Sequence, residues 1–552
     1  WLKIEIARAP LAPGPAPPCA HGHPAMGGNA GKSLQAAVVR TESRVGKVQV
    51  TGRYHQLPRK LEDDYDETGV ILGQGYNGKV FLADSKTSKL KFAVKGFKLT
   101  GINSERKEEL TNELEIFLGM DHPHVARLND VYETKEMLYL VMECMSGGEL
   151  FKRICEKKRF SEKDAADAAW QMLLAIAYIH SHDIVHRDIK LENYLYETPA
   201  SNHLKLIDFG FSKVWNPNTK LHLSCGTLAY VAPEVLGENY TSKCDMWSFG
   251  VTSFILLMGY MPFSGTEEHQ SKCIRQGIWK KKPEVWSKIS PGAQDFLSKL
   301  LVVDAKQRLS AEEALKHEWI AKRDHMTDSM EHVDQSVADA LVSFGQASHF
   351  RRACMEMMAW SLTNEERKEV RDAFVELDKD RSGAISMQEF KKVMMDKFHI
   401  SDANAQQAFE ALDTSHHDEI HYTDFLAAMV STRIRMHDDL LKATFRRFDT
   451  DNSGFIDKAD LQKVLGDAFE GESIDHLMEE ANAHGGKISL DEFMEFLKHG
   501  DAGEHHHDAA NRIIDKAIAH PDHAAGRERK IANKSPKAVS TKSSGGSCCS
   551  VM

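Results

Sequence analysis

The sequence predicts a multidomain α+β protein, with a mixed domain of strands and helices followed by an all-α domain. With 552 residues, the chain is too long for a single hydrophobic core. Apolar strand and helix patterns share the region up to about residue 320. Beyond it, helices are interrupted by acidic loops, in which isoleucines recur at spacings in the thirties: Ile385, Ile420, Ile456 and Ile488. Such a period is typical of a repeated supersecondary unit.

Composition excludes several classes of function. The formal net charge of −11 is opposite to the basic surface that nucleic-acid binding requires, so we expect no nucleic-acid partner. The nine cysteines show no paired spacing, which indicates free thiols in a reducing compartment. No run approaches the roughly 18 apolar residues that span a bilayer. We therefore expect a soluble, monomeric, cytoplasmic protein, with residues 1–64 as a disordered extension because Leu11–Pro24 is rich in Pro, Ala and Gly.

The segment from Ile184 to Gly210 carries the residue types of phosphoryl transfer. It supplies an acid, Asp188, then Lys190, Asn193 and a second acid, Asp208. Transfer to a hydroxyl requires a group that accepts the hydroxyl proton, cations on the γ-phosphate and oxygen ligands for magnesium. A His-Arg-Asp loop with Asn five residues after its Asp, followed by Asp-Phe-Gly, provides these parts in that order.

A glycine-rich turn and a strand that ends in lysine precede this segment. Gly73–Val80 matches G-x-G-x-x-G-x-V, a turn that lets backbone amides approach phosphates. Phe92–Lys95 follows as a strand, and the helical stretch Lys107–Met120 carries Glu113, placed to pair with Lys95. Glycine turns are common, and either charge could be a solvated surface group. The order and spacing relative to Asp188 favour a catalytic ion pair.

These motifs, with Ala232-Pro233-Glu234, Asp245–Gly250 and Arg308 as the partner of Glu234, resemble the eukaryotic protein-kinase set over about residues 65–320. The resemblance implies a two-lobed fold with ATP in the cleft. It implies that Asp188 is the base, Lys190 contacts the γ-phosphate, and Asn193 and Asp208 hold Mg²⁺. The nucleotide-binding residues that it implies are Leu72, Gly73, Gln74, Gly75, Tyr76, Asn77, Gly78, Lys79, Val80, Lys95, Glu143, Met145 and Glu149.

The residues that indicate substrate specificity form a weaker pattern than the catalytic motifs. Lys190, together with Thr227 before the Ala-Pro-Glu triplet, resembles kinases that phosphorylate Ser/Thr acceptors of protein substrates. Glu149 and Glu192 match acidic positions that often receive an arginine of the substrate, which predicts a basic-directed preference. Asn77 departs from the pattern, since an aromatic residue usually stands there, but the change removes no catalytic group.

The repeated unit in the second half contains candidate calcium loops. Asp378–Glu389 has side-chain oxygens at positions 1, 3, 5 and 12 and glycine at position 6, as a calcium-binding loop requires. Asp449–Asp460 keeps this pattern but ends in Asp460, whose shorter side chain reaches the ion less readily with two oxygens. The expected Ca²⁺ ligands are Asp378, Asp380, Ser382, Ala384 and Glu389, and Asp449, Asp451, Ser453, Phe455 and Asp460.

Two further loops are degraded. Asp413–Asp424 has Asp418 in place of glycine and His417 at position 5, and Ala481–Glu492 lacks the first carboxylate. For both we expect a structural helix-loop-helix without strong calcium binding. A kinase followed by four such units resembles the calcium-dependent protein kinases, which carry a calmodulin-like EF-hand domain; this resemblance covers about residues 65–500.

The family implies an autoinhibitory junction, here residues 325–361, before the EF-hand domain at 362–500. Phe350–Trp360 is basic and amphipathic with a Met/Trp face, the kind of helix that a calcium-opened groove captures. Without calcium, the junction is expected to block or distort the kinase. An ordinary packing helix is the simpler alternative. Two other functions stay open, namely a constitutive kinase with a docking module and an inactive calcium-sensing scaffold.

The tail, residues 501–552, is basic and ends in Cys549-Ser-Val-Met. This tetrapeptide fits C-a-a-X with a methionine that favours farnesylation of Cys549. Basic residues upstream, or acylation of Cys548, would supply the second signal that stable anchoring needs. We expect peripheral membrane attachment by this route. A plain tail with two free thiols is the alternative.

Overall fold

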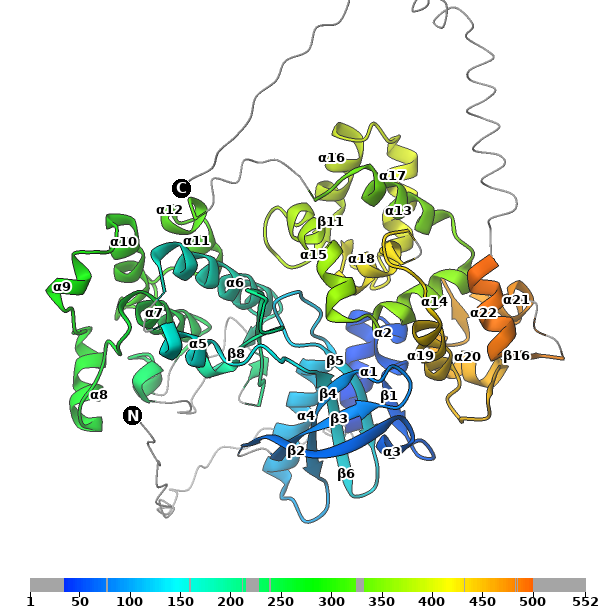
Figure 1. Cartoon of the computed structure of the whole chain (residues 1–552), viewed down its shortest axis with the longest axis horizontal. Coiled ribbons are helices and arrows are strands. Elements are labelled where there is room, and N and C mark those ends of the chain that lie inside the picture. The colour runs from blue at the N-terminus through cyan, green and yellow to red at the C-terminus, as the bar shows by residue number, and fades with distance from the viewer. Residues whose placement is uncertain are drawn as a thin grey trace, which may run out of the picture. The chain divides into compact units, whose positions relative to one another are not determined.

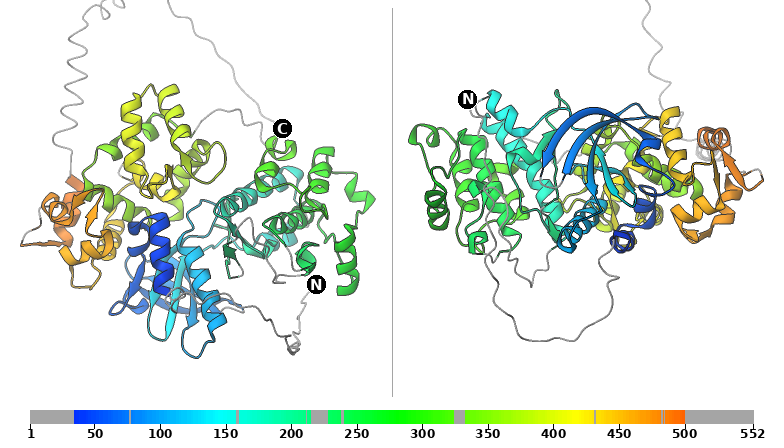
Figure 2. Two further views of the ribbon diagram at one scale, coloured as in Figure 1. Left: turned by 180° about the vertical axis from the view of Figure 1, so that it is seen from behind. Right: turned by 90° about the horizontal axis from the view of Figure 1, so that it is seen from below.

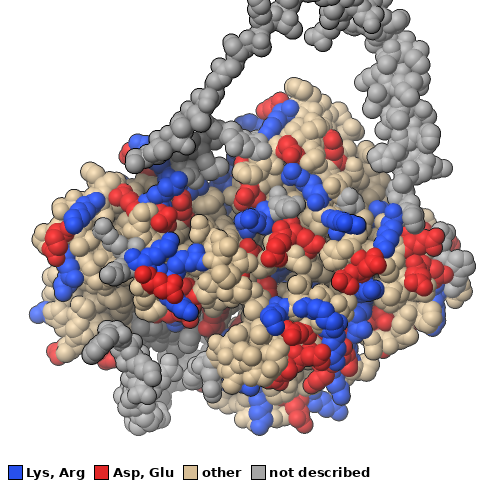
Figure 3. Space-filling model, viewed as in Figure 1, with Lys and Arg blue, Asp and Glu red and all other residues tan. Residues whose placement is uncertain are grey.

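The computed structural model describes residues 34–75, 78–157, 160–210, 212–214, 228–237, 240–323, 332–430, 432–481, 483 and 485–499. The chain divides into two compact units, residues 1–490 and 491–552. Of the second unit, only the part of α22 (Leu490–His499) beyond Leu490 is described. No described helix is long and apolar enough to cross a membrane. Figure 3 shows one face of the molecule, on which acidic and basic side chains are interspersed.

The smaller lobe of the first unit is built on a six-stranded sheet (Figure 1). Its strands lie in the order β1-β5-β6-β4-β3-β2, with β1 parallel to β5 and the other pairs antiparallel. The apolar face of α4 shares one core with the sheet through Leu110, Leu114 and Phe117. The elements are α1 (Leu34–Val45), α2 (Lys47–Thr51), β1 (Tyr54–Gln56), α3 (Leu61–Asp64), β2 (Tyr65–Gly75), β3 (Gly78–Ser85), β4 (Lys91–Lys98), α4 (Ser104–Leu118), β5 (Leu128–Glu133) and β6 (Met137–Glu143).

The first four of these elements differ from the disordered extension expected for residues 1–64. Residues 34–64 are ordered because apolar side chains of α1 and α2, among them Val38 and Val50, enter the core that also contains α4. Arg40 of α1 also pairs with Glu115 of α4 at 2.6 Å. The Pro-rich stretch Leu11–Pro24, which motivated the expectation, lies outside the described residues.

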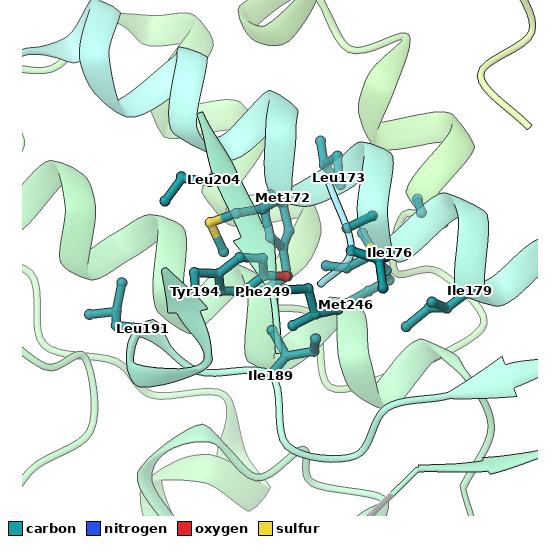
Figure 4. Packing of buried hydrophobic residues seen from close by; sticks show 14 of the residues in the cluster. Met172, Leu173, Ile176, Ile179, Ile189, Leu191, Tyr194, Leu204, Met246 and Phe249 are labelled. Atoms are coloured by element: carbon teal, nitrogen blue, oxygen red, sulfur yellow. The ribbon is translucent and has the colours of Figure 1, made fainter. Parts of the chain in front are cut away.

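The larger lobe is mainly helical (Figure 2), and α6 and α7 contribute much of its buried core. Figure 4 shows how Met172, Leu173, Ile176 and Ile179 of α6 pack with Ile189, Leu191 and Tyr194, which follow Asp188, and with Met246 and Phe249 of α7. This core therefore supports the catalytic segment. The elements are α5 (Leu150–Lys157), α6 (Glu162–Ser181), β7 (Ile184–Val185), β8 (Tyr194–Tyr196), β9 (Leu204–Leu206), β10 (Lys213–Val214), α7 (Lys243–Met258), α8 (Glu267–Gln276), α9 (Pro283–Trp286), α10 (Pro291–Leu300), α11 (Ala311–Leu315) and α12 (Glu318–Ala321), with 3₁₀ turns at Leu191–Asn193, Leu228–Tyr230 and Val235–Gly237.

Beyond the larger lobe, paired helices are joined by short antiparallel ribbons. Ile385 pairs with Ile420, and Ile456 pairs with Ile488, so the repeated isoleucines join the four loops two by two. The elements are α13 (Gln335–Gln346), α14 (His349–Ala359), α15 (Asn364–Leu377), β11 (Ile385–Ser386), α16 (Met387–Asp396), α17 (Asp402–Leu412), β12 (Glu419–Ile420), α18 (Tyr422–Met429), α19 (Asp438–Phe448), β13 (Phe455–Asp457), α20 (Lys458–Leu465), β14 (Ala468–Phe469), β15 (Glu472–Ser473), α21 (Ile474–Glu480) and β16 (Lys487–Ser489).

Candidate active site and calcium loops

Lys95 is held between two carboxylates. Its Nζ lies 2.6 Å from Glu113 Oε1 and 3.2 Å from Asp208 Oδ1, and it is only 9 % exposed. Burial by itself lowers the pKa of Lys95, but Glu113 and Asp208 outweigh it and raise the pKa. The ammonium group therefore keeps its charge. Strand β4 and helix α4 thus bring the predicted ion pair together in the position where a phosphate would be bound.

Asp188, Lys190 and Asn193 form a connected group in the loop after β7. Lys190 Nζ lies 2.5 Å from Asp188 Oδ2. The amide nitrogen of Asn193 donates to the same Oδ2 at 3.0 Å and to the Asp188 carbonyl at 2.7 Å. The 3₁₀ turn Leu191–Asn193 brings the amide back to the acid. A carboxylate fixed in this way is oriented to accept a proton from a substrate hydroxyl.

Asp245 fixes the backbone of this loop. Its two carboxylate oxygens accept hydrogen bonds from the backbone N–H groups of His186 and Arg187, both at 2.9 Å. His180 Nε2 lies 2.9 Å from the same carboxylate. These bonds hold Arg187 in a left-handed conformation with φ of 68°. The sequence motif at Asp245 supported the resemblance to kinases but did not indicate this role.

Phe209 links the predicted magnesium-binding segment to α4. The ring is buried, and its centroid lies 5.5 Å from that of Phe117 in α4 and 5.2 Å from that of His186. Asp208, in a left-handed conformation with φ of 62°, directs its carboxylate toward Lys95. Burial raises the pKa of Asp208, but Lys95 has the opposite effect and the net pKa is lowered. Asp208 is thus an anionic ligand suited to a divalent cation.

The nucleotide loop is described in part. Gly75 pairs with Gly78 and Val80 with Lys95, so β2, β3 and β4 place the turn beside the lysine. Leu72 and Lys79 are exposed. The predicted positions Tyr76 and Asn77 lie outside the described residues, as do Thr227 and Cys549. The predicted residues Gly73 and Gln74 belong to β2, of which Gly73 is half-buried.

Glu143, one of the predicted nucleotide-binding residues, has one unexpected partner. The carboxylate of Glu143 is buried and accepts from Lys205 at 2.7 Å and from Arg367 of α15. Its side chain is therefore engaged by the larger lobe and by the first EF-hand helix. Met145 is half-buried and Glu149 is exposed.

Glu192 is the second predicted substrate-binding acid. One of its carboxylate oxygens is buried without a hydrogen-bond partner among the described residues. Burial raises the pKa of Glu192, and the charges of Glu149 and Asp188 add to the effect. Three acids near one another make this side of the cleft favourable for a cation.

The predicted calcium ligands converge in two loops. Carboxylate oxygens of Asp378, Asp380 and Glu389 lie within 4.8 Å of one another, and so do those of Asp449, Asp451 and Asp460. The hydroxyls of Ser382 and Ser453 donate to the carbonyls of Ala384 and Phe455, at 3.0 and 3.2 Å, so these oxygens are also adjacent. Burial raises the pKa of Asp378 to about 8. Each loop presents the all-oxygen set that fits Ca²⁺.

The second loop is closed by other contacts. Asp424, at its twelfth position, is buried and accepts from Gln49 of α2 and from Thr414, both at 2.9 Å. The carboxylate thus serves as a hydrogen-bond acceptor between the N-terminal segment and the loop. The fourth loop pairs with the third through β13 and β16. Among the described residues, neither loop brings three metal-ligating carboxylates together.

The first calcium loop contacts the end of α6. At Gly383, an added Cβ would lie 2.3 Å from Tyr178 Cδ2 and 3.0 Å from His122 Cδ2. The Ser181 hydroxyl donates to the Ser382 carbonyl at 3.3 Å. A few residues after Ser181, the chain enters β7 and the loop of Asp188. The short segment from Ser181 to Asp188 therefore contacts the calcium loop at one end and leads into the catalytic loop at the other.

The predicted junction helix α14 lies among EF-hand helices rather than on the catalytic residues. It packs against α18, α19 and α21, and its apolar face, with Phe350 and Met357, is buried. At its end, the Trp360 ring is covered by the guanidinium groups of Arg53 at 3.5 Å and Arg127 at 4.0 Å. Trp360 Nε1 donates to Gln49 at 2.8 Å. No pattern in the sequence pointed to these partners.

Comparisons with known proteins agree with this geometry. The protein kinase domain matches residues 67–320, and the EF-hand domain pair matches residues 361–430 and again 438–498. These matches confirm the multidomain α+β architecture as a kinase domain followed by two EF-hand pairs, and they imply ATP, Mg²⁺ and Ca²⁺ as cofactors. The residues described above fit all three.

Individual relatives extend the match over most of the chain. "Calcium-dependent protein kinase 34" of Arabidopsis thaliana is 32% identical over 81% of this chain and 87% of its own length. "Calcium-dependent protein kinase 3" of Plasmodium berghei is 32% identical over 79% of this chain and 81% of its own length. The same-named protein of Plasmodium yoelii yoelii is 33% identical over 73% and 75%. With both domains and their order in common, the chain belongs to the calcium-dependent protein kinases.

Proposed function

We propose that this chain is a calcium-activated serine/threonine protein kinase that is held inactive through residues 325–361 until calcium binds its EF-hand domain. The observation that carries the proposal is the direct contact between the EF-hand domain and the catalytic domain. Arg367 of the first EF-hand helix bonds Glu143 of the catalytic domain, and Gly383 of the first calcium loop packs on Tyr178. Calcium binding to Asp378–Glu389 therefore acts on residues that touch the kinase.

The chemistry would follow from the arrangement of the charged groups. Asp188 accepts the proton of the substrate hydroxyl while Lys190, 2.5 Å from its carboxylate, is placed to neutralise the transferred phosphoryl group. Lys95 orients the other phosphates and is itself held by Glu113. Asn193 and Asp208 would hold magnesium, which supplies the positive charge that the transferred group needs.

Regulation would act through the junction. Helix α14 is buried among α18, α19 and α21, and its end at Trp360 lies on Arg53 and Arg127 of the smaller lobe. A change in the angle between EF-hand helices, of the kind that calcium produces in sensors, would release or engage α14. Residues 324–331, between the kinase and α13, lie outside the described residues.

The test compares phosphorylation of Ser and Thr peptides by the full chain with calcium and with a chelator. We expect calcium to raise activity, and the double variant E389Q/D460N to lose the response while it keeps the fold. Equal activity under both conditions would indicate a constitutive kinase. No turnover under either condition would indicate a scaffold. The D188N variant provides the background rate both with calcium and with the chelator.

A preference for basic substrates forms part of the proposal, because the carboxylate of Glu192 is close enough to both Glu149 and Asp188 for their charges to act on it. The pair of peptides that tests it differs only in an Arg three residues before the acceptor. We expect a higher kcat/KM with the Arg, and a smaller difference between the two peptides in the E149Q variant. Equal rates for the two peptides would remove this part of the proposal.

If Met552 ends the mature chain, farnesylation of Cys549 would attach the kinase to a membrane and restrict it to substrates there. The upstream basic residues would supply the second attraction, to anionic lipid. The C549S variant should then move from the membrane fraction to the soluble fraction of cells, while C548S keeps part of the attachment. An unchanged membrane fraction for C549S would contradict this.

A further inference from the structure

A polar cavity of about 300 Å³ lies outside the active site and the first and third calcium loops. It is lined by residues of α1, α2, α14, the second EF-hand unit with the start of its degraded loop, and the β14 hairpin. The charged residues of the lining are mainly acidic, and Lys47 is its one lysine. The acids are Glu42, Glu356, Glu410, Asp413 and Glu470. No feature of the kinase chemistry or of calcium binding accounts for this cavity.

Glu356 is the unusual member of the lining. Its side chain is completely buried, and neither carboxylate oxygen has a hydrogen-bond partner among the described residues. Burial raises the pKa of Glu356, and the neighbouring charges of Asp424 and Glu470 act in the same direction. The cation whose charge opposes this shift, Arg352, one turn earlier on α14, is occupied by Glu470 and by the Ala347 carbonyl. Buried carboxylates without a partner are rare, because desolvation is then uncompensated.

The arrangement of the acids limits the kind of ligand. Among the described residues, groups of three carboxylates with oxygens within 4.8 Å of one another occur in the two calcium loops and not in this cavity. A single metal ion could therefore not bind three of these acids at once in this arrangement. An elongated molecule with separated positive charges could contact several of them. The wall formed by Val48, Leu465 and Phe469 is apolar and suits the methylene groups between such charges.

We propose that this cavity binds an aliphatic diamine or polyamine, with one ammonium group on the carboxylate of Glu356 and another on the other acids of the lining. The ammonium would supply the partner that Glu356 lacks, as a charge-assisted hydrogen bond. The site goes beyond the proposed kinase activity. It joins α2, α14 and the second EF-hand unit, so its ligand binds three segments at once.

The experiment is isothermal titration of the full, calcium-loaded chain with spermidine and, separately, with putrescine at fixed ionic strength. We expect saturable binding by the wild type and at least about tenfold weaker binding by Glu356→Gln, because a hydrogen bond to a charged group is lost. Glu312→Gln removes an exposed charge of α11 and should bind like the wild type. Ammonium chloride provides the single-charge control.

Three results would overturn the proposal. They are no saturable binding by the wild type, equal binding by the Glu356→Gln and Glu312→Gln variants, or an equal response to ammonium chloride at matched charge. A second variant, Ala411→Leu, fills the cavity from its wall without touching an acid. It should also weaken spermidine binding by about tenfold. Because binding is the readout, the result is independent of kinase activity.

Discussion

Arg367 of α15 donates to the carboxylate of Glu143 at the end of β6, and both side chains are almost completely buried. The two residues are 224 positions apart in the chain. Lys205 binds the same carboxylate at 2.7 Å. The first EF-hand helix is thus bound to the segment that joins the two lobes of the kinase. A small displacement of this segment would change the orientation of one lobe relative to the other.

Loss of this ion pair should destabilise the protein more than loss of a surface pair in the same EF-hand unit. Breaking a buried pair costs about 3–5 kcal/mol, and because Lys205 remains beside Glu143 we expect the lower end for Arg367→Ala. Lys391→Ala, which removes a partly exposed pair with Asp402, should cost below about 1 kcal/mol. Denaturant unfolding of the full chain measures both. Equal losses would mean that the buried pair makes no special contribution.

The same carboxylate gives a pH dependence. Burial alone would raise the pKa of Glu143, but Lys205 and Arg367 lower it from 4.5 to about 2. The depressed pKa means that the stabilisation is complete above pH 4.5 and is lost as the pH falls toward about 2. The difference in Tm between the wild type and Glu143→Gln should therefore be largest near neutral pH and shrink in acid. A difference that stays constant across this range would contradict the assignment.

Gly383 and Gly454 allow a matched comparison. They occupy the same position in the first and third calcium loops and have φ of 89° and 86°. Only Gly383 is packed against another part of the chain, since an added Cβ there meets Tyr178, whereas Gly454 has nothing within 4 Å. Both alanine variants should lose calcium affinity through backbone strain. Gly383→Ala should in addition lower the calcium-stimulated kcat. Similar kinase activity in both variants would show that the Tyr178 contact does not influence catalysis.

The twelfth residue of each calcium loop should set its affinity. Glu389 can offer two oxygens to the ion, whereas the shorter Asp460 reaches it less readily. Asp460→Glu should tighten calcium binding at the third loop by roughly tenfold, and Glu389→Asp should weaken binding at the first by a similar factor. Calorimetric titration resolves the two classes of site. An Asp460→Glu variant with unchanged affinity would show that another ligand limits the third loop.

Asp188→Asn should remove most of the phosphoryl-transfer activity while substrate binding persists. General bases contribute roughly 10²–10⁴-fold, so kcat should fall by that factor with little change in KM. The shape of the loop should survive, because Asp245 holds its backbone from outside. Steady-state kinetics at saturating calcium measures the loss. A kcat within a few-fold of the wild type would require another base.

Residues whose spacing is fixed by chemistry could be placed from the sequence. Asp188, Lys190 and Asn193 act within one loop, so their order in the chain is also their arrangement in space. The repeat likewise located Ile385 and Ile420 at equivalent positions of two units, and the structure shows that they face each other in one ribbon. In each case, the partners are local or related by the repeat.

Contacts between distant segments could not be placed in this way. The pairing of Glu143 with Arg367 links residues whose neighbours in the sequence carry no matching pattern. The strand Tyr54–Gln56 is too short for a period of two to be detected. The cover of Trp360 by Arg53 depends on the whole packing of α2 and α14. Such contacts follow from the tertiary fold rather than from local preference.

The parallel strand β1 has a consequence for any shortened form of this protein. Tyr54–Gln56 pairs with Val131, Tyr132 and Glu133 and so covers the outer side of β5. A chain that began where the kinase domain match begins, at residue 67, would leave unpaired those backbone amides and carbonyls of β5 that face away from β6. An exposed strand edge of this kind can form backbone hydrogen bonds with a strand of another chain. The catalytic domain without its N-terminal segment should therefore self-associate, even though every catalytic residue is present.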